Sequence, residues 1–174
     1  MKKIILTVFA ATSLLLYSTP SFAISISVGV PIGASIKGDD GSEVADGASG
    51  YFLGVQLPFG LGLGMDSHKT KVKDSTWKIA HTMYNLYYQL PVPVVSLILG
   101  LGTGNSNYDA PYDKNYDKGA ATQWYTSIGF PIIPLFDIHL SYRSITSKNI
   151  KWKGDGSKED VSGTITGIGL AFNF

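Results

Sequence analysis

His139 and Ser141 are of the residue types that nucleophilic catalysis uses, and they lie two positions apart in an apolar segment. A serine hydroxyl becomes a nucleophile when a neighbouring histidine takes its proton and a third group orients that histidine. In a strand this spacing puts both side chains on one face. The only acidic orienter we can suggest is Glu159, from another segment. Because the sequence does not make three groups converge, we predict no catalytic residues and keep this pair as weak candidates.

Several ionisable residues fall on the polar side of alternating segments, where a closed barrel would bury them. Buried charges are costly unless they are paired. We therefore predict an interior network of hydrogen bonds and salt bridges, in which Arg143 pairs with Asp137 or Asp66. The predicted members are Asp66, His68, His81, Asp137, His139 and Arg143.

His68 and His81 are expected to face each other. If Asp74 and Ser75 form a hairpin tip, residues whose numbers sum to 149 are opposite one another on the two strands. Two opposed imidazoles could bind a metal or respond to pH. The interpretation we favour is a pair of neutral histidines within the interior network, so no metal and no cofactor is predicted.

A segment from Asn105 to Gly119 repeats a Tyr-Asp pair every four residues and is expected to be a long loop. Spaced carboxylates could hold Ca²⁺, but the spacing does not match an EF-hand. Tyrosine-rich loops suit protein recognition, so we predict a flexible recognition loop. The pairs are Tyr108 and Asp109, Tyr112 and Asp113, and Tyr116 and Asp117.

Three lysines, Lys69, Lys71 and Lys78, lie toward the loop end of two neighbouring segments, on the outward-facing positions. Cationic side chains there could bind the phosphates of lipopolysaccharide, because lysine is a competent phosphate partner. A solvated hairpin tip is the alternative.

Residues 1–23 are typical of a secretory signal peptide. Lys2 and Lys3 precede an apolar run that ends at Tyr17, and the small residues before Ala23 predict cleavage after it. Residues 24–174 then form one domain in length. Of 14 basic residues, two lie in the leader, which leaves 12 against 13 acidic residues and argues against nucleic-acid binding. The absence of cysteine excludes a disulfide-held fold.

Eight segments of the remaining chain alternate between large apolar and small or polar residues, which predicts eight strands. Pro31, inside the first segment, is expected to mark a bulge or a kink. Charged residues concentrate in the connections, whereas a soluble sandwich would carry them along the middles of its strands. The predicted strands are 24–36, 50–57, 61–72, 76–90, 94–104, 120–130, 135–147 and 161–174.

The connections alternate between short turns that contain proline and longer polar loops. Short turns at one end and longer loops at the other are typical of outer-membrane barrels. The even number of strands allows closure, with both termini and the proline turns on the periplasmic side. The fold class predicted is therefore an all-β, eight-stranded antiparallel up-and-down transmembrane β-barrel.

The leader, the eight alternating segments and the terminal Phe174 resemble the small outer-membrane barrels of Gram-negative bacteria: OmpX/Ail, the OmpA membrane domain and the YfaZ-like proteins. Ser141-Tyr142-Arg143 is weakly similar to a Gly-Tyr-Arg element common in such barrels. The resemblance implies a monomer in the bacterial outer membrane, with lipid and lipopolysaccharide as partners. It also implies that Phe174 is a signal to the barrel-assembly machinery.

The function predicted is a non-enzymatic, structural or surface-interaction role through the extracellular loops. Two alternatives remain. The spacing of His139 and Ser141 is similar to that in the lipid A deacylase PagL, which would imply an enzyme that modifies lipid A or phospholipid. A narrow, porin-like pore or a small-ligand carrier would require the interior network to leave a channel.

Overall fold

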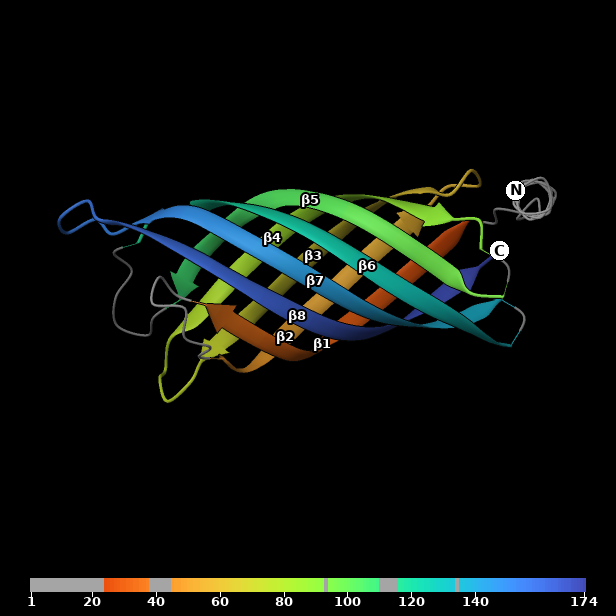
Figure 1. Cartoon of the computed structure of the whole chain (residues 1–174), viewed down its shortest axis with the longest axis horizontal. Helices are drawn as coiled ribbons and strands as arrows, with labels where there is room; N and C mark the ends of the chain where they lie inside the picture. Colours follow the sequence, from red (N-terminus) through yellow and green to blue (C-terminus); the bar gives the residue numbers. More distant parts are fainter. Residues whose placement is uncertain (1–23, 38–44, 93, 110–115, 134) are drawn as a thin grey trace, which may run out of the picture.

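The chain folds into one closed barrel of eight antiparallel strands, in which each strand pairs with the next along the sequence and β8 closes on β1 (Figure 1). The structure is a computed structural model, and it describes residues 24–37, 45–92, 94–109, 116–133 and 135–174. The predicted leader lies outside the described residues. The strands are β1 Ser25–Lys37, β2 Ala45–Gln56, β3 Leu61–Val72, β4 Lys78–Leu90, β5 Ser96–Asp109, β6 Gly119–Ile133, β7 Phe136–Lys151 and β8 Lys158–Asn173.

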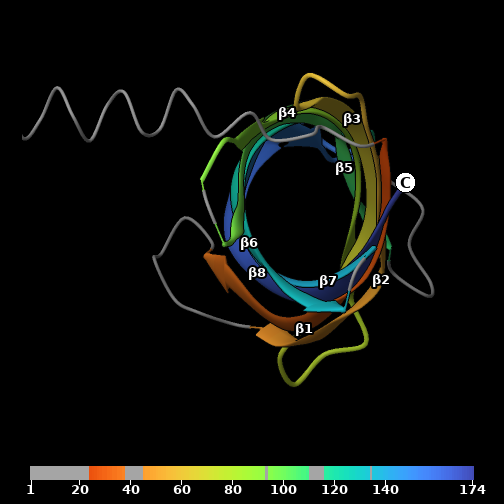
Figure 2. The same ribbon diagram turned by 90° about the vertical axis from the view of Figure 1, so that its right-hand side faces the viewer.

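The predicted fold class is confirmed in strand number, direction and closure. Figure 2 looks along the barrel and shows the strands arranged as one closed ring. An eight-stranded barrel has an interior just wide enough for its own side chains to fill. Among the described residues, no helix is long and apolar enough to cross a membrane.

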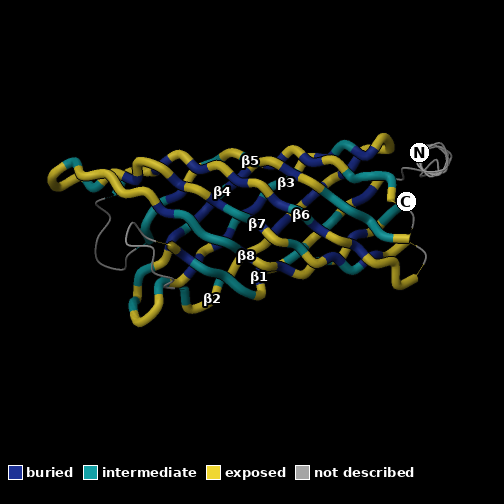
Figure 3. Tube along the Cα trace, viewed as in Figure 1, coloured by how far each residue is buried: buried dark blue, intermediate teal, exposed yellow. Residues whose placement is uncertain are grey.

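Exposed residues alternate with buried ones along the strands (Figure 3). Many of the exposed residues are large and apolar, so the outer wall is an apolar surface. This is the arrangement predicted from the sequence, and it follows from the two-residue period of a strand. The exposed wall residues include Ile26, Val28, Val30, Leu53, Val55, Leu63, Leu86, Leu99, Leu101, Trp124, Leu140, Ile168, Leu170 and Phe172.

Most strands extend further than their apolar pattern predicts, mainly at the end away from the termini, although β6 also continues to Ile133 at the other end. The predicted loop beginning at Asn105 is wrong at its start, because β5 continues to Asp109. Likewise β2 begins at Ala45, β7 ends at Lys151 and β8 begins at Lys158. The alternation of apolar and polar residues marks only the part of each strand that faces lipid. Pairing between backbones does not require apolar side chains, so the strands continue beyond the lipid into water.

Two of the register shifts in the barrel turn an isoleucine into the lumen. The register of β1 against β8 shifts between Pro31 and Gly33, as the proline suggested, and Ile36 consequently turns into the lumen. The register of β7 against β8 shifts between Ser147 and Ile150, where Asn149 has a φ of 57°. A bulge places two residues opposite one and thereby reverses the alternation. Ile150 is therefore fully buried.

The lumen at the end away from the termini is filled by an apolar plug, which we define as two adjoining clusters. Its branched side chains and one aromatic ring come from five strands and leave little solvent-accessible area. The first cluster is Ile36, Ile79, Ile150 and Val161, and the second is Phe52, Ile145 and Ile165. A small-to-polar interior was predicted for these strands, so the plug is a feature that the alternation did not reveal.

Both described termini lie at one end of the barrel, beside the short connections (Figure 1). The Phe174 N–H donates a hydrogen bond of 2.9 Å to the Ile24 carbonyl, which closes the seam between the first and last strands. The longer strands and hairpin tips project at the opposite end. This polarity agrees with the predicted arrangement of a periplasmic end that carries the termini and an extracellular end that carries the loops.

Candidate functional site

A buried ion pair crosses the middle of the lumen. The Arg143 Nε of β7 lies 3.0 Å from the Asp66 Oδ2 of β3, and both side chains are almost fully buried. Gln123 of β6 donates to the same carboxylate oxygen at 2.6 Å and to the Asn85 side-chain oxygen at 2.7 Å. Of the two partners predicted for Arg143, the structure brings Asp66 to it. Charge-assisted bonds from two donors compensate the cost of burying this carboxylate.

The guanidinium of Arg143 is held between two aromatic rings. Its central carbon lies 3.6 Å from the centre of the Phe52 ring and 4.9 Å from that of Tyr125. A planar cation stacks favourably on aromatic faces, and the rings also exclude water from the ion pair. The arginine is thereby fixed in orientation as well as in charge.

Glycines on neighbouring strands make room for the inward tyrosines. A Cβ atom at Gly100 would overlap the Tyr125 ring, and one at Gly62 would overlap the Tyr87 ring. In both cases the glycine and the tyrosine are directly opposite in the register. These two tyrosine rings lie 6.3 Å apart and line the same cavity as the ion pair. The abundance of glycine on the inward positions therefore has a steric cause.

His68 and His81 are directly opposite in the register and their ring centres are 4.9 Å apart. His81 Nδ1 shares a 2.6 Å hydrogen bond with the Ser106 hydroxyl, which in turn bonds to Ser147 at 2.7 Å. Both nitrogens of His68 are buried without a hydrogen-bond partner. The pair adjoins Phe52, whose ring meets the edge of His68 at 5.9 Å.

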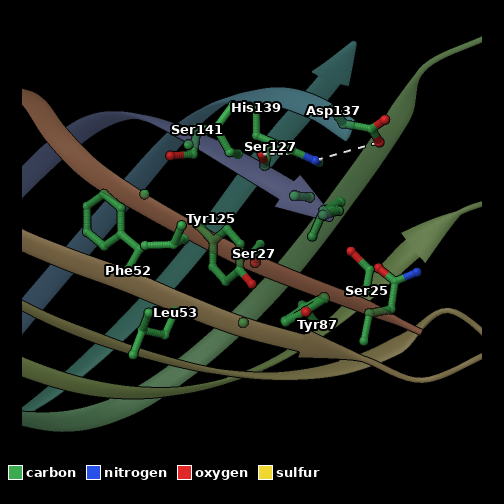
Figure 4. Close-up of a pocket in the computed structure, with 18 of the residues that line it drawn as sticks. Ser25, Ser27, Phe52, Leu53, Tyr87, Tyr125, Ser127, Asp137, His139 and Ser141 are labelled. Atoms are coloured by element: carbon green, nitrogen blue, oxygen red, sulfur yellow. Dashed lines mark hydrogen bonds and ion pairs between the residues drawn. The ribbon is translucent and has the colours of Figure 1, made fainter. Parts of the chain in front are cut away.

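Asp137 and His139 lie at the other end of the interior (Figure 4), where Asp137 is opposite Ala171 near the end of β8. The Asp137 Oδ2 and the His139 Nε2 are 3.8 Å apart, and each residue is only 8% exposed. His139 Nδ1 contacts the Ser127 hydroxyl at 3.4 Å. These groups line a cavity of about 60 Å³ that runs from Ser25, near the end of the barrel, inward to Arg143.

His139 and Ser141 share this inward face but do not form a catalytic pair within the described structure. The Ser141 hydroxyl accepts a bond from Arg143 and contacts the Gly167 carbonyl at 3.4 Å. The histidine instead contacts Ser127. A serine nucleophile needs its hydroxyl bonded to the base, and here that hydroxyl bonds elsewhere.

At the rim away from the termini, two of the three predicted lysines form ion pairs with carboxylates. Lys69 contacts Asp109 at 2.6 Å and Lys71 contacts Asp46 at 2.7 Å. Lys78 is opposite Lys71 in the register of β3 and β4. On these strands the outward positions change from apolar to polar before the lysines are reached, so the lysines lie beyond the apolar wall.

The predicted recognition residues divide into three groups. The rings of Tyr108 and Tyr116 have centres 4.8 Å apart, and both pack against Trp77. The two tyrosines also pack against the first cluster of the plug. Asp109 and Asp117 form ion pairs with Lys69 and with Lys153, the latter at 3.2 Å. Tyr112 and Asp113 lie outside the described residues. The four described residues therefore stabilise the structure of the rim, through ring packing and ion pairs.

Sequence reasoning missed the residues that close the lumen. Ile36 and Ile150 point inward only because a bulge precedes each of them, and for the first bulge Pro31 was the sequence signal. A further signal for the second bulge was Asn149, since asparagine tolerates positive φ more readily than most residues. Gln123 also belongs to the interior network, and its bonds to Asp66 and Asn85 join strands that are far apart in the sequence.

One family matches nearly the whole chain. Its description is "Outer membrane protein beta-barrel domain", and its sequence model matches residues 7–174. The chain belongs to this family. Membership agrees with the closed barrel and its apolar outer wall, and it indicates the bacterial outer membrane as the location of the protein.

Solved structures of other outer-membrane proteins have a similar fold. Neisserial surface protein A is 14% identical, with a TM-score of 0.64 over 89% of this chain and 98% of its own. Outer Membrane Protein W of E. coli is 9% identical, with a TM-score of 0.54 over 87% and 98% of the two chains. OprG of Pseudomonas aeruginosa is 12% identical, with a TM-score of 0.50 over 90% and 98%. No curated protein sequence matches the chain.

Proposed function

We propose that this member of the outer-membrane barrel family is a non-enzymatic, closed barrel that acts through its extracellular rim. The observation that carries the proposal is the apolar plug. Its branched side chains fill the lumen just where a pore would have to open to the outside. An apolar constriction of this kind excludes ions because water cannot solvate them there.

The polar half of the lumen supports the same proposal. Arg143 and Gln123 both donate to Asp66 across its width, and the charges of Arg143 and Asp66 neutralise each other. A conducting path would have to break a buried ion pair as well as displace the plug. For the alternative of a lipid-modifying enzyme, the hydroxyl of Ser141 bonds to Arg143 and both candidate residues face the interior, away from lipid.

The rim offers a cationic surface that fits the phosphates of lipopolysaccharide, which we propose as its partner. The tip of the β3–β4 hairpin carries Lys69, Lys71, Lys73 and Lys78, against the carboxylates of Asp46, Asp74 and Asp109. Within the described residues, Lys73 and Lys78 form no ion pair. Lys71 and Lys78 are opposite each other, and like charges so placed are destabilising. A phosphate between them would relieve that repulsion.

Conductance and turnover test the closed, non-enzymatic barrel. The mature chain, inserted in a planar lipid bilayer, is expected to give no ion channels. A variant with Ile36→Ala and Ile150→Ala, which empties part of the plug, provides the comparison for a widened lumen. Steady conductance by the unaltered protein would contradict the proposal. Release of fatty acid from lipid A or phospholipid, abolished by Ser141→Ala, would establish the enzymatic alternative instead.

A further inference from the structure

The cavity at the periplasmic end contains a carboxylate that no cation balances. Asp137 is 8% exposed, and among the described residues its nearest cationic candidate is His139, at 3.8 Å. The only other charges lining the cavity, Arg143 and Asp66, are paired with each other. With His139 neutral, the cavity therefore carries one unmatched negative charge. Burying such a charge without a partner is costly in free energy, so a bound cation would stabilise the site.

His139 presents a second unsatisfied group at the same place. Its Nε2 is buried and has no hydrogen-bond partner. Its other nitrogen, Nδ1, contacts the Ser127 hydroxyl at 3.4 Å. In the tautomer that carries its proton on Nδ1, the ring donates a hydrogen bond to Ser127. The lone pair of Nε2 is then free to bind a ligand. Figure 4 shows this ring and the Asp137 carboxylate side by side on the cavity wall.

We propose that Asp137 and His139 bind a divalent transition-metal ion, such as Zn²⁺, from the periplasmic side. Imidazole and carboxylate together suit such ions. Zinc lies about 2.0–2.2 Å from nitrogen and oxygen ligands, so two ligands of a tetrahedral ion are about 3.4 Å apart. The Asp137 Oδ2 and the His139 Nε2, 3.8 Å apart, need to approach by about 0.4 Å to hold such an ion. Two protein ligands leave coordination positions that water in the cavity fills.

The surroundings orient both ligands as metal sites require. The Ser96 hydroxyl donates to the Asp137 Oδ2 at 3.0 Å, and Gln89 donates to Ser96 at 3.3 Å. Ligand carboxylates and imidazoles are ordinarily held by such outer hydrogen bonds. Gly129, opposite His139 in the register, gives the ring its room, because a Cβ atom there would overlap it. A cavity of about 60 Å³ holds roughly four waters, enough to complete the coordination.

Cobalt binding tests the site without knowledge of its natural ion. The mature, tag-free protein is folded in detergent and titrated with Co²⁺, whose visible absorption reports coordination, and Zn²⁺ is then added as a competitor. One Co²⁺ per chain, displaced by Zn²⁺, is the expected result. His139→Gln and Asp137→Asn should each weaken binding by at least about tenfold. His81→Gln, in the other half of the lumen, should leave it unchanged.

Three outcomes would overturn the proposal. The unaltered protein binds neither ion at millimolar concentration, binding survives both Asp137→Asn and His139→Gln, or binding is lost in His81→Gln alone. The last result would place the ion at the His68 and His81 pair. The change in gel mobility on heating reports whether each variant folds. If the two ligand variants do not fold, Ser127→Ala keeps both ligands and should still lower the affinity.

Discussion

Arg143 of β7 and Asp66 of β3, 77 residues apart in the sequence, form an ion pair of 3.0 Å across the lumen. The pair joins opposite walls of the barrel, and Phe52 and Tyr125 shield it from water. A buried charge that loses its partner is left uncompensated, whereas removal of both charges together is much less harmful. The stability of the folded barrel therefore depends on the presence of both Arg143 and Asp66.

Asp66→Asn alone is therefore expected to lower the free energy of unfolding by about 3–5 kcal/mol. The double variant Asp66→Asn with Arg143→Met should recover part of that loss, because no charge is then buried alone. Urea unfolding in lipid vesicles measures both. Equal destabilisation of the single and double variants would show that the pair is solvated.

Ile150→Ala in the plug is expected to cost about 2–5 kcal/mol, because it leaves a cavity in a fully buried cluster. Leu101→Ala is the matched control, since Leu101 is 70% exposed on the outer wall and its loss leaves no cavity. The same unfolding assay compares them. A larger loss for Leu101→Ala would contradict the assignment of the plug as packed core.

Gly100→Ala should destabilise the barrel by about 1–3 kcal/mol, because the added methyl group overlaps the Tyr125 ring. Tyr125→Ala made in the same chain removes the ring and should make the alanine at position 100 neutral. The difference between the two backgrounds isolates the steric contact. Equal effects in both backgrounds would mean that the glycine serves another purpose.

Removal of Lys71 and Lys78 should weaken binding to lipid A phosphates by roughly three- to tenfold, an electrostatic effect that salt would reduce. Lys151→Gln with Lys158→Gln, at the β7–β8 hairpin, removes the same charge elsewhere and is the control. Binding to vesicles that contain lipid A, compared with its dephosphorylated form, provides the measurement. Equal losses in both variants would indicate an effect of net charge only.

The tip of the β7–β8 hairpin has its own dependence on pH. The backbone N–H of Ser157 donates a 2.7 Å bond to Asp155, and this bond, followed by that of the Ser157 hydroxyl, holds the pKa of Asp155 below its ordinary value of 3.8. Because the folded pKa is the lower one, the stabilisation is complete above pH 3.8 and is lost as the pH falls through the lowered value.

Nuclear magnetic resonance of the Asp155 carboxyl carbon follows this titration. Its midpoint should lie below 3.8 in the folded protein, since a bonded carboxylate resists protonation. Ser157→Ala keeps the backbone donor and should raise the midpoint only part of the way. A midpoint of 3.8 in the unaltered protein would mean that the turn is open in solution.

The sequence by itself determined the barrel wall. The alternation along strands such as β8, with Ile168 and Leu170 outward and Gly167 and Gly169 inward, is local information, because a strand turns each successive side chain to the other face. The opposition of His68 and His81 was likewise readable, since a tight hairpin fixes the register of its two strands.

Only the tertiary structure decided what fills the lumen. Whether Arg143 meets Asp66 or Asp137 depends on the curvature and stagger of the closed sheet, which no single segment encodes. The inward turn of Ile36 and Ile150 depends on bulges, which local alternation does not record beyond a proline or an asparagine. The orphan Nε2 of His139 beside Asp137 exists only because closure buries the inner face of β7, and burial removes the water that would otherwise satisfy both groups.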